Sequence, residues 1–503
     1  MTKLIAFLLC ACGLLTSCGQ QADGDAIQNT IEQMNWRIAE IQTTVSEYNK
    51  DAAHIYYVST SGNDKNDGLS PETPLASPQG ANKLAQEGDV VLFKRGDEWR
   101  VRWPTKAGVT YSAYGEGPKP IFNGNKYGNA ADPSHWTLVE GTENVWKYKE
   151  IIPDVGCIVF NEGEYVGLKL RPEVHEKKFH IWTVKGFEPF EFNNRCFKQD
   201  LSFVSEYVYL ATNGADAGTP ARLYLRCDSG NPGDVYDSIE IMYRGNVISA
   251  KSGVTLDNLC VKYTGGHGIG AGTVENLTVR NCEVGWIGGS AQYFTNHYMI
   301  CFGNGIEVYG GCKNYTVDNC YVYQCYDAGI THQYSNGGGE NPVYHETVRF
   351  TNNVIEKCIY DIEFFLGRTD SGKIDIRVMK DVLYKGNILA YSGEGWGYDP
   401  SRAAGIKGWD NNNHTENFVV EENVFLLNKT DAWHIGADKE EWIPTFRNNT
   451  YIHRAKERFI RLGRPYNGKY TSIPMPFQEK YIEKVFEFIG ETGSKCYFVD
   501  PKA

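Results

Sequence analysis

From about residue 246 onward the chain repeats a pattern of alternating apolar and polar positions that closes on asparagine. Residues 275–282 and 314–320 are two copies of it, and similar units end at Asn353, Asn387, Asn423 and Asn449. Spacings in this range indicate stacked repeats, and β-branched residues in alternation indicate strands. One asparagine per coil at one corner predicts an asparagine ladder, whose register the sequence leaves uncertain by one residue. We therefore predict an all-β fold, a right-handed parallel β-helix over residues 246–470 that carries the active cleft.

Several other segments flank this repeat. We predict a signal peptide at 1–17, a tether with a heptad helix at 18–53, the first coils and their cap at 54–135, a β-rich insertion at 136–245, and a C-terminal cap at 471–503. Short helices over 78–86 and 478–489 are predicted to cover the two ends of the β-helix. An open end exposes unpaired backbone groups and needs such a cover.

The N-terminal residues have the pattern of an export signal. Lys3 precedes an apolar run over residues 4–15, which is too short to span a membrane. The run ends at residues 15–18 (LTSC), which resemble the lipobox of bacterial lipoproteins. That resemblance implies an exported protein anchored to the outer membrane by a lipid on Cys18, facing either the periplasm or the cell exterior. The alternative is an ordinary secretory signal cleaved elsewhere.

A stripe of apolar residues follows the tether at alternating spacings of four and three: Ile27, Ile31, Met34, Ile38, Ile41 and Val45. This is a heptad pattern. It predicts either a single amphipathic helix packed on the main body, or a coiled-coil stalk that forms a homo-oligomer through residues 27–48.

Composition narrows the partners. The chain has 503 residues, a net charge of −12 and 13% aromatic residues, and this acidic balance disfavours nucleic acid. Cysteines lack the paired spacing of zinc sites, and Cys282 and Cys320 occupy equivalent repeat positions. We therefore expect few disulfides, no metal site and no cofactor.

Each repeat also contains a second short strand, often with the dipeptide Gly-Ile. If each isoleucine points inward, its neighbours point outward, because strand side chains alternate. The first outward row then contains Gly270, Glu307, Thr331, Glu363 and Lys407. The row two residues further on contains Gly272, Tyr309, Gln333, Phe365 and Trp409.

Residues 263–269 (YTGGHGI) and 281–289 (NCEVGWIGG) resemble a group of exported parallel β-helix carbohydrate-active enzymes from glycan-degrading bacteria. The resemblance covers most of the chain after residue 54, and it implies a polysaccharide or oligosaccharide as partner. It does not imply one reaction, because β-helices carry hydrolases, lyases, esterases and epimerases.

The carboxylates of the outward row favour glycoside hydrolysis. Glu307 and Glu363 lie two coils apart, which places their Cα atoms about 9 to 10 Å apart, and Asp361 would share the face of Glu363 at about 6.5 Å. Inverting glycosidases separate their carboxyls by about 6.5–9.5 Å and retaining ones by about 5–5.5 Å. Lys407 and His267 are predicted as supporting residues, with His267 either a proton shuttle or a structural histidine. The plain alternative is a solvated row of charges.

Aromatic and amide side chains beside these carboxylates are predicted to bind sugar: Tyr309, Gln333, Phe365, Trp409, Trp396 and Trp286. Two alternative functions remain. One is a polysaccharide lyase that cleaves a uronate-containing glycan, with Lys407 as base and bound Ca²⁺. The other is a non-catalytic glycan-binding surface lipoprotein.

Overall fold

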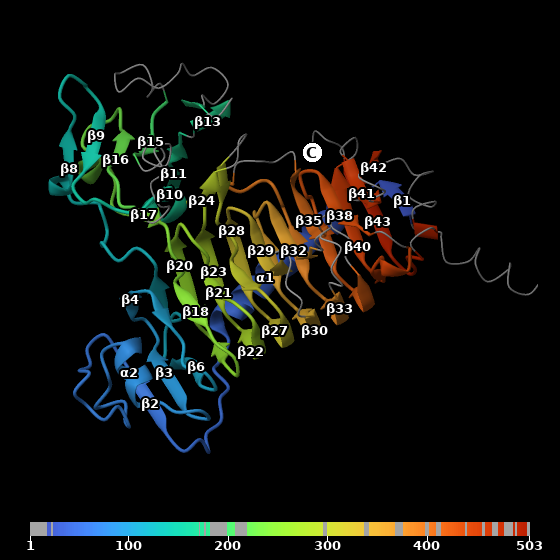
Figure 1. Cartoon of the computed structure of the whole chain (residues 1–503), viewed down its shortest axis with the longest axis horizontal. Coiled ribbons are helices and arrows are strands. Elements are labelled where there is room, and N and C mark those ends of the chain that lie inside the picture. Colours follow the sequence, from blue (N-terminus) through green and yellow to red (C-terminus); the bar gives the residue numbers. More distant parts are fainter. Residues whose placement is uncertain are drawn as a thin grey trace, which may run out of the picture.

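In the computed structural model of the protein, the described residues are 18–21, 24–170, 172–175, 178–181, 199–206, 219–294, 299–335, 342–367, 376–397, 402–408, 414–437, 440–454, 458–464, 471–476, 486–487 and 490–499. Their strands form three long sheets that run side by side along the molecule (Figure 1). Nearly all neighbouring strands in these sheets are parallel, and the chain visits the sheets in turn. The predicted right-handed parallel β-helix is confirmed.

Sheet 1 contains β2 (Ile55–Val58), β3 (Val90–Lys94), β6 (Thr110–Tyr114), β19 (Thr255–Asp257), β22 (Val274–Arg280), β27 (Cys312–Asp318), β30 (Val343–Thr351), β33 (Arg377–Lys385), β36 (Thr415–Glu421) and β39 (Thr445–Arg447). Sheet 2 contains β4 (Glu98–Arg100), β7 (Ile121–Asn123), β20 (Cys260–Thr264), β23 (Glu283–Ile287), β28 (Tyr321–Cys325), β31 (Val354–Glu356), β34 (Ile388–Ala390), β37 (Val424–Leu426), β40 (Thr450–Arg454), β43 (Lys495–Val499) and β1 (Cys18–Gln21). Sheet 3 contains β5 (Trp103–Pro104), β18 (Ile248–Ala250), β21 (Ile269–Ala271), β26 (Ile306–Tyr309), β29 (Ala328–Tyr334), β32 (Tyr360–Leu366), β35 (Ala404–Gly408), β38 (Asp431–Gly436), β41 (Arg458–Arg464) and β42 (Thr471–Pro476), the last of them antiparallel to β41.

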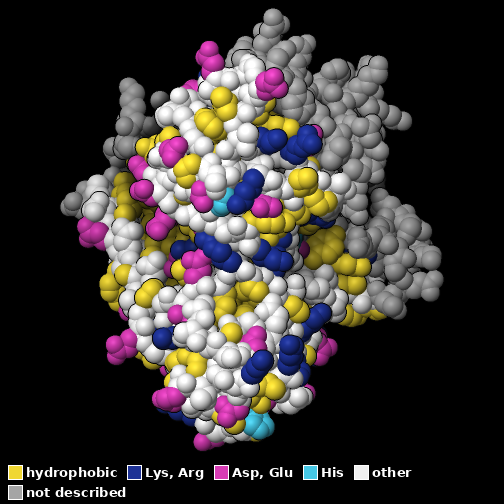
Figure 2. All heavy atoms as spheres, turned by 90° about the vertical axis from the view of Figure 1, so that its left-hand side faces the viewer, with side chains coloured by type: hydrophobic (Ala, Val, Ile, Leu, Met, Phe, Trp, Pro, Cys, Tyr) yellow, Lys and Arg dark blue, Asp and Glu magenta, His cyan; other side chains and the backbone are white. Residues whose placement is uncertain are grey.

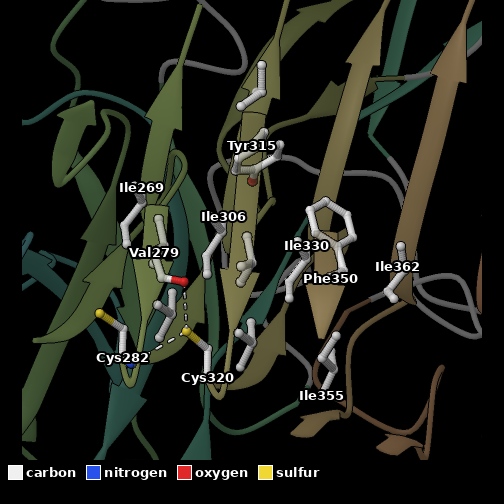
Figure 3. Close-up of a cluster of buried hydrophobic side chains, with 14 of the residues drawn as sticks. Ile269, Val279, Cys282, Ile306, Tyr315, Cys320, Ile330, Phe350, Ile355 and Ile362 are labelled. Carbon is white, nitrogen blue, oxygen red and sulfur yellow. Dashed lines mark hydrogen bonds between the residues drawn. The ribbon is translucent and has the colours of Figure 1, made fainter. Parts of the chain in front are cut away.

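Apolar side chains fill the interior in rows that run from coil to coil. Ile269, Ile306, Ile330, Ile362 and Ile406 are in register on neighbouring strands of sheet 3, and all are buried. Figure 3 shows the first four of them along one side of the core. The prediction that these isoleucines point inward is confirmed, and it sets the direction of their neighbours.

The corner between sheets 1 and 2 resolves the uncertain register of the ladder. Buried asparagines bond to one another along the later coils, with Asn353 Nδ2 donating to Asn387 Oδ1 at 2.9 Å and Asn387 Nδ2 to Asn423 Oδ1 at 2.9 Å. In the two earlier coils Cys282 and Cys320 hold this inner position (Figure 3). The ladder therefore begins only at Asn353.

The N-terminal end of the β-helix is covered as predicted. Helix α2 (Pro78–Leu84) lies over the first strands (Figure 1). Ser77 starts the helix, because its side chain accepts a hydrogen bond from the backbone N–H of Gly80 at 3.0 Å. The predicted C-terminal helix over 478–489 lies largely outside the described residues.

Between β7 and β18 the chain leaves the β-helix and builds a β-rich unit with a core of its own. Its elements are η1 (Pro133–His135), β8 (Trp136–Leu138), β9 (Val145–Tyr148), β10 (Val155–Phe160), η2 (Asn161–Gly163), β11 (Tyr165–Val166), β12 (Leu168–Lys169), β13 (Pro172–His175), β14 (Lys178–Ile181), β15 (Ser202–Ser205), β16 (Leu223–Arg226), α4 (Pro232–Val235) and β17 (Ile239–Tyr243). Three short elements lie later in the chain, namely β24 (Ala291–Phe294), β25 (Met299–Cys301) and η5 (Glu440–Trp442).

Arginines of the first coils fasten this unit to the β-helix. Arg100 Nη2 lies 2.6 Å from Glu240 Oε1, and the Arg102 guanidinium lies 3.8 Å from the ring centroid of Tyr243. Figure 2 shows this end of the molecule. Lys and Arg side chains lie together near the middle of the view, between the β-rich insertion in its upper part and the N-terminal cap in its lower part. Desolvated contacts of this kind hold the two parts at a fixed place.

The heptad stripe from Ile27 to Ile41 belongs to α1 (Gly24–Thr43), which lies across sheet 2 of its own chain (Figure 1). Its last predicted member, Val45, lies beyond the helix and is exposed. Met34 and Ile41 are buried against Val354, Ile388 and Leu426 of that sheet. The stripe is therefore covered by sheet 2 of the same chain, as the first alternative predicts, and is not the seam of a coiled-coil stalk. A homo-oligomer through residues 27–48 stays a prediction. Within the described part of the chain no helix has the length and apolar character needed to cross a membrane.

Apart from Cys18 in β1, ten cysteines are described, and all ten are buried and free of disulfides. The signal segment at 1–17 and Cys196 lie outside the described residues.

Candidate active site

The outward face of sheet 3 carries a continuous row of polar side chains, which we call the outer row. Strand register aligns Gly270, Glu307, Thr331, Glu363, Lys407, His434 and Arg461. The first five are the residues predicted from the sequence. His434, whose register the sequence left open, and Arg461 extend the row by two coils.

The outer row is not a solvated ladder. Glu363 is only 2% exposed and Lys407 only 3%, although both point away from the apolar core. A charge without water is costly unless a partner or a hydrogen bond offsets that cost. Burial of this many ionisable groups on one outward face indicates a functional site rather than a surface.

Glu307 contacts two nitrogen atoms, one of which, His267 Nδ1, also accepts a hydrogen bond from the backbone N–H of Asn304 at 3.2 Å. Its Oε2 lies 2.8 Å from Nδ1 of His267 and accepts a hydrogen bond from Asn304 Nδ2 at 2.7 Å. Asn304 is fixed in turn, because its Oδ1 accepts from the backbone N–H of Ala328 at 3.0 Å. His267 therefore contacts the outer row, and its role as a proton shuttle stays a prediction.

Asp327 is a member of this group that sequence reasoning missed. It precedes β29, and it interacts electrostatically with both His267 and Glu307. Burial, the larger cause, and the neighbouring Glu307 raise the pKa of Asp327 to about 7, while His267 acts in the opposite direction. Asp327 therefore holds its proton to a much higher pH than an exposed aspartate does. Its position three residues before Ile330 was the only signal in the sequence.

The expectation that Asp361 shares the outward face of Glu363 is wrong. Asp361 is fully buried, and neither carboxylate oxygen has a hydrogen-bond partner among the described residues. A side chain at the equivalent Gly329, one coil earlier, would meet Cys358 Sγ at 3.4 Å, and one at Gly405 would meet Asn428 Nδ2 at 2.8 Å. These atoms belong to the interior corner between sheets 2 and 3, so Asp361 points inward.

The physical reason is the bend at that corner. Ala328 pairs with Tyr360 and Ile330 with Ile362, while the residue between them leaves the ladder. Simple alternation fails at this position, and four of the five coils from Gly268 to Gly405 place glycine there. Burial is the main cause that raises the pKa of Asp361 well above its ordinary value, with Cys358 and Glu356 adding to it.

A cationic group lies further along the same face. Lys407 Nζ is 2.8 Å from His434 Nδ1, and Asp431 Oδ1 accepts from Arg458 Nε at 2.5 Å. Arg461 Nε lies 3.6 Å from the other oxygen of Asp431. The face is therefore divided, with carboxylates at Glu307 and Glu363 and cations from Lys407 onward.

The predicted sugar-binding residues separate into two groups. Tyr309, Gln333 and Phe365 are in register beside the outer row, as expected, and the Tyr309 hydroxyl lies 2.8 Å from Ser335 Oγ. Trp409 lies outside the described residues.

The structure corrects the prediction that Trp286 and Trp396 lie beside the carboxylates and bind sugar. Both pack in one apolar cluster where the insertion meets the β-helix, and Trp396 Nε1 donates to the backbone oxygen of Gln324 at 2.9 Å. Trp286 is buried beneath the insertion, where a side chain at Gly163 would come within 2.4 Å of its ring. These indoles stabilise the junction rather than line the outer row.

Within the described ranges, no group of three or more His, Cys, Asp or Glu side chains is arranged to hold a metal ion.

No protein-family model and no curated protein matches the chain. Similar solved structures include a complex of XylC with xylose (TM-score 0.42, 13% identity, covering 88% of this chain and 82% of that one). Another is described as a glycoside hydrolase (0.44, 8%, 89% and 96%), and a third is the pectate lyase Pel9A (0.42, 12%, 82% and 77%). The second and third are of enzyme classes that the sequence resemblance named. Likenesses of this degree carry no argument about activity, which rests on the residues of the outer row.

Proposed function

We propose that the protein is a glycoside hydrolase that acts on a polysaccharide or oligosaccharide across the outward face of sheet 3. The observation that carries this proposal is the pair Glu307 and Glu363, two buried carboxyl side chains in one row, two coils apart. Two strand spacings separate their Cα atoms by about 9.5 Å, at the upper end of the carboxyl separation of inverting enzymes, about 6.5–9.5 Å.

The two environments suit two roles. Glu307 accepts from Asn304 and lies beside His267, an arrangement that suits a general base which activates water. Glu363 is withdrawn from water, as suits a carboxylic acid that gives its proton to the leaving oxygen. Asp327 supports Glu307 through His267 as a positioning residue. Tyr309 and Phe365 offer aromatic faces on which a sugar ring can stack.

The test is a glycan screen that reads two products at once. The protein assayed starts at residue 18 and carries Cys18→Ser, because α1 packs on sheet 2 and its loss would expose that sheet. Plant, algal and host glycans are incubated with it, and reducing ends and ultraviolet absorbance are followed together. Hydrolysis gives reducing ends without absorbance. Absence of both with every glycan would instead support a non-catalytic glycan-binding protein.

A second candidate, a polysaccharide lyase, is favoured by one observation. Lys407 lies in the row beside Glu363, contacts His434 and has Arg461 two coils further on. Such a cationic group suits a uronate carboxylate, with Lys407 taking the proton next to it and Ca²⁺ as a possible neutralising partner. A lyase would produce absorbance together with reducing ends, and its activity would fall on addition of chelator.

Export and lipid anchoring through Cys18 are part of the proposal, supported by the lipobox-like residues 15–18. Expressed in a bacterial host with radiolabelled fatty acid, the full chain is expected to carry label and to sediment with outer membranes. The Cys18→Ser variant should carry none, and label retained on that variant would contradict the anchor.

A further inference from the structure

A groove of about 740 Å³ runs beside α1, away from the outer row. Its floor is the corner between sheets 1 and 2, where the left-handed turn residues of successive coils line up: Asn281, Asn319, Asn352, Gly386 and Glu422. Its wall is one face of α1 with Gln33, Trp36, Arg37 and Glu40. Four coil spacings give the floor a length of about 19 Å, enough for a short chain of sugar residues.

The wall presents an aromatic ring to solvent. Trp36 is 63% exposed, although it lies on a helix whose neighbouring turns are buried against sheet 2. The indole of Trp36 offers an apolar face and an N–H that donates to no group among the described residues. Single exposed apolar residues are ordinary, so Trp36 gains its meaning from the groove beside it.

Polar groups along the groove keep hydrogen-bonding capacity. Among the described residues, the side chains of Gln33 and Glu40 have no hydrogen bond to another part of the chain. Asn319 and Asn352 donate to Asn281 and Asp318 of the preceding coil, which leaves their side-chain oxygens as acceptors. Planar amides and carboxylates spaced one coil apart suit hydroxyl groups that recur along a polymer.

Charge selects against an anionic ligand. The lining contains four acidic residues, Glu40, Glu47, Asp318 and Glu422. Of its two arginines, Arg280 is paired, with Nε 3.1 Å from Asp257 Oδ1, and Arg37 Nη1 donates to the backbone oxygen of Gly386 at 2.9 Å. Among the acidic residues, Glu422 Oε1 lies 2.9 Å from Lys385 Nζ, so four carboxylates face two guanidinium groups and one neighbouring ammonium group. A uronate or sulfated chain would meet net negative charge here.

We infer that this groove is a second glycan-binding site, specific for a neutral oligosaccharide chain and separate from the reacting site on sheet 3. The inference rests on the proposed function only in taking carbohydrate as the ligand. A site here would keep a polymer on the enzyme while the outer row acts on another part of it.

The test measures binding stoichiometry with neutral oligosaccharides by titration calorimetry. The probes are hexasaccharides of the xylan, mannan and β-glucan types, with an oligogalacturonide as the anionic comparison. The chain from residue 18 with Cys18→Ser is used, alone and with Trp36→Ala or Gln33→Ala. Tyr344→Ala is the matched control, because Tyr344 is also an exposed aromatic but lies at the far end of β30.

One site per chain is expected to disappear or weaken by about tenfold or more in Trp36→Ala, the usual effect of removing an aromatic anchor. Gln33→Ala should weaken the same site by a smaller factor, and Tyr344→Ala should leave it unchanged. Turnover of a short soluble substrate should not change in any of these variants. If the proposed hydrolase were wrong, this turnover would be absent while the loss of one site remained.

The inference is overturned if Trp36→Ala binds every neutral probe as the parent does, or if only the oligogalacturonide binds. It is also overturned if the parent binds no probe, or if Trp36→Ala loses binding to phosphatidylcholine vesicles and to no glycan, which would assign the indole to a membrane surface.

Discussion

Glu363 stands in the middle of the outer row, between Thr331 and Lys407. Replacement by glutamine keeps its shape and removes its proton chemistry. We expect Glu363→Gln to lower kcat by a factor of about 10²–10⁴, the usual contribution of a positioned acid or base, with an unchanged melting temperature. Glu356→Gln is the control, because Glu356 is also a buried glutamate but lies on sheet 2. Near-native turnover in Glu363→Gln would remove this residue from the reaction.

For Asp361 we predict that substitution changes stability and leaves turnover intact, the reverse of the expectation for Glu363. Its carboxyl faces the interior corner, so Asp361→Asn should fold and retain turnover. Because its pKa is raised in the folded state, the folded chain keeps this proton above about pH 3.9 while the unfolded chain releases it, so the wild type becomes less stable as pH rises from about 3.9. The melting temperature of Asp361→Asn should therefore exceed that of the wild type by a margin that grows from pH 4 to pH 7. Loss of activity with native stability would contradict this placement.

The sequence predicts which side chains point outward where strand alternation is regular, and it fails where the chain bends between two sheets. Glu307, Glu363 and Lys407 follow from inward isoleucines, because the strand period is two. Asp361 does not, since it lies where the chain turns between two sheets. Asp327 joins Glu307 only through the stacking of different coils, which no spacing along one strand could indicate.

Helix α1 shows what an apolar pattern predicts about an element and what it leaves open. A heptad stripe records that one face of a helix is apolar, and it does not say whether a second helix or a sheet covers that face. Here sheet 2 of the same chain presents Val354, Ile388 and Leu426 to it. The β-rich character of the insertion was likewise visible in its strand pattern, whereas its junction through Arg100 and Trp286 was not.

If α1 is part of the fold, shortening its buried side chains must cost stability. Ile41 is fully buried, and Ile41→Ala should lower the free energy of unfolding by about 2–5 kcal/mol, the range for such truncations in a core. Val45→Ala, at a position that is 79% exposed, should change it little. Denaturant midpoints followed by tryptophan fluorescence provide the comparison. Equal midpoints for the two variants would return α1 to the role of a detached stalk.

Across the whole molecule, buried ionisable groups of two kinds oppose each other. Burial lowers the pKa of His345 to about 4 and of His453 to about 3, so both stay neutral in the folded chain. His345 belongs to an internal chain of hydrogen bonds with His332 and Tyr384. Burial also raises the pKa of Glu491 to about 7, as it raises that of Asp361.

These pKa shifts predict that the melting temperature changes little with pH in the mildly acidic range and falls at lower pH. As pH falls below about 6.5, the unfolded chain gains protons on its histidines while the folded chain does not, which destabilises the folded state. The buried carboxyls act in the opposite direction: down to about pH 4.3 they are protonated in the folded chain and ionised in the unfolded chain, so the folded state becomes more stable as pH falls. The two effects oppose each other between pH 6.5 and about 4.5, so the melting temperature should change little there. Below about pH 4.3 the buried carboxyls no longer oppose the histidines, whose effect continues until the folded pKa values of about 4 and 3 are reached. Glu283 and Glu421, whose pKa values are lowered in the folded chain, also lose their stabilising contribution as pH falls, so stability should drop there. Glu491→Gln removes one opposing carboxyl, so its melting temperature should begin to fall already near pH 6.5. If the melting temperature of the wild type fell in parallel with that of Glu491→Gln from about pH 6.5, the buried carboxyls would not offset the histidines.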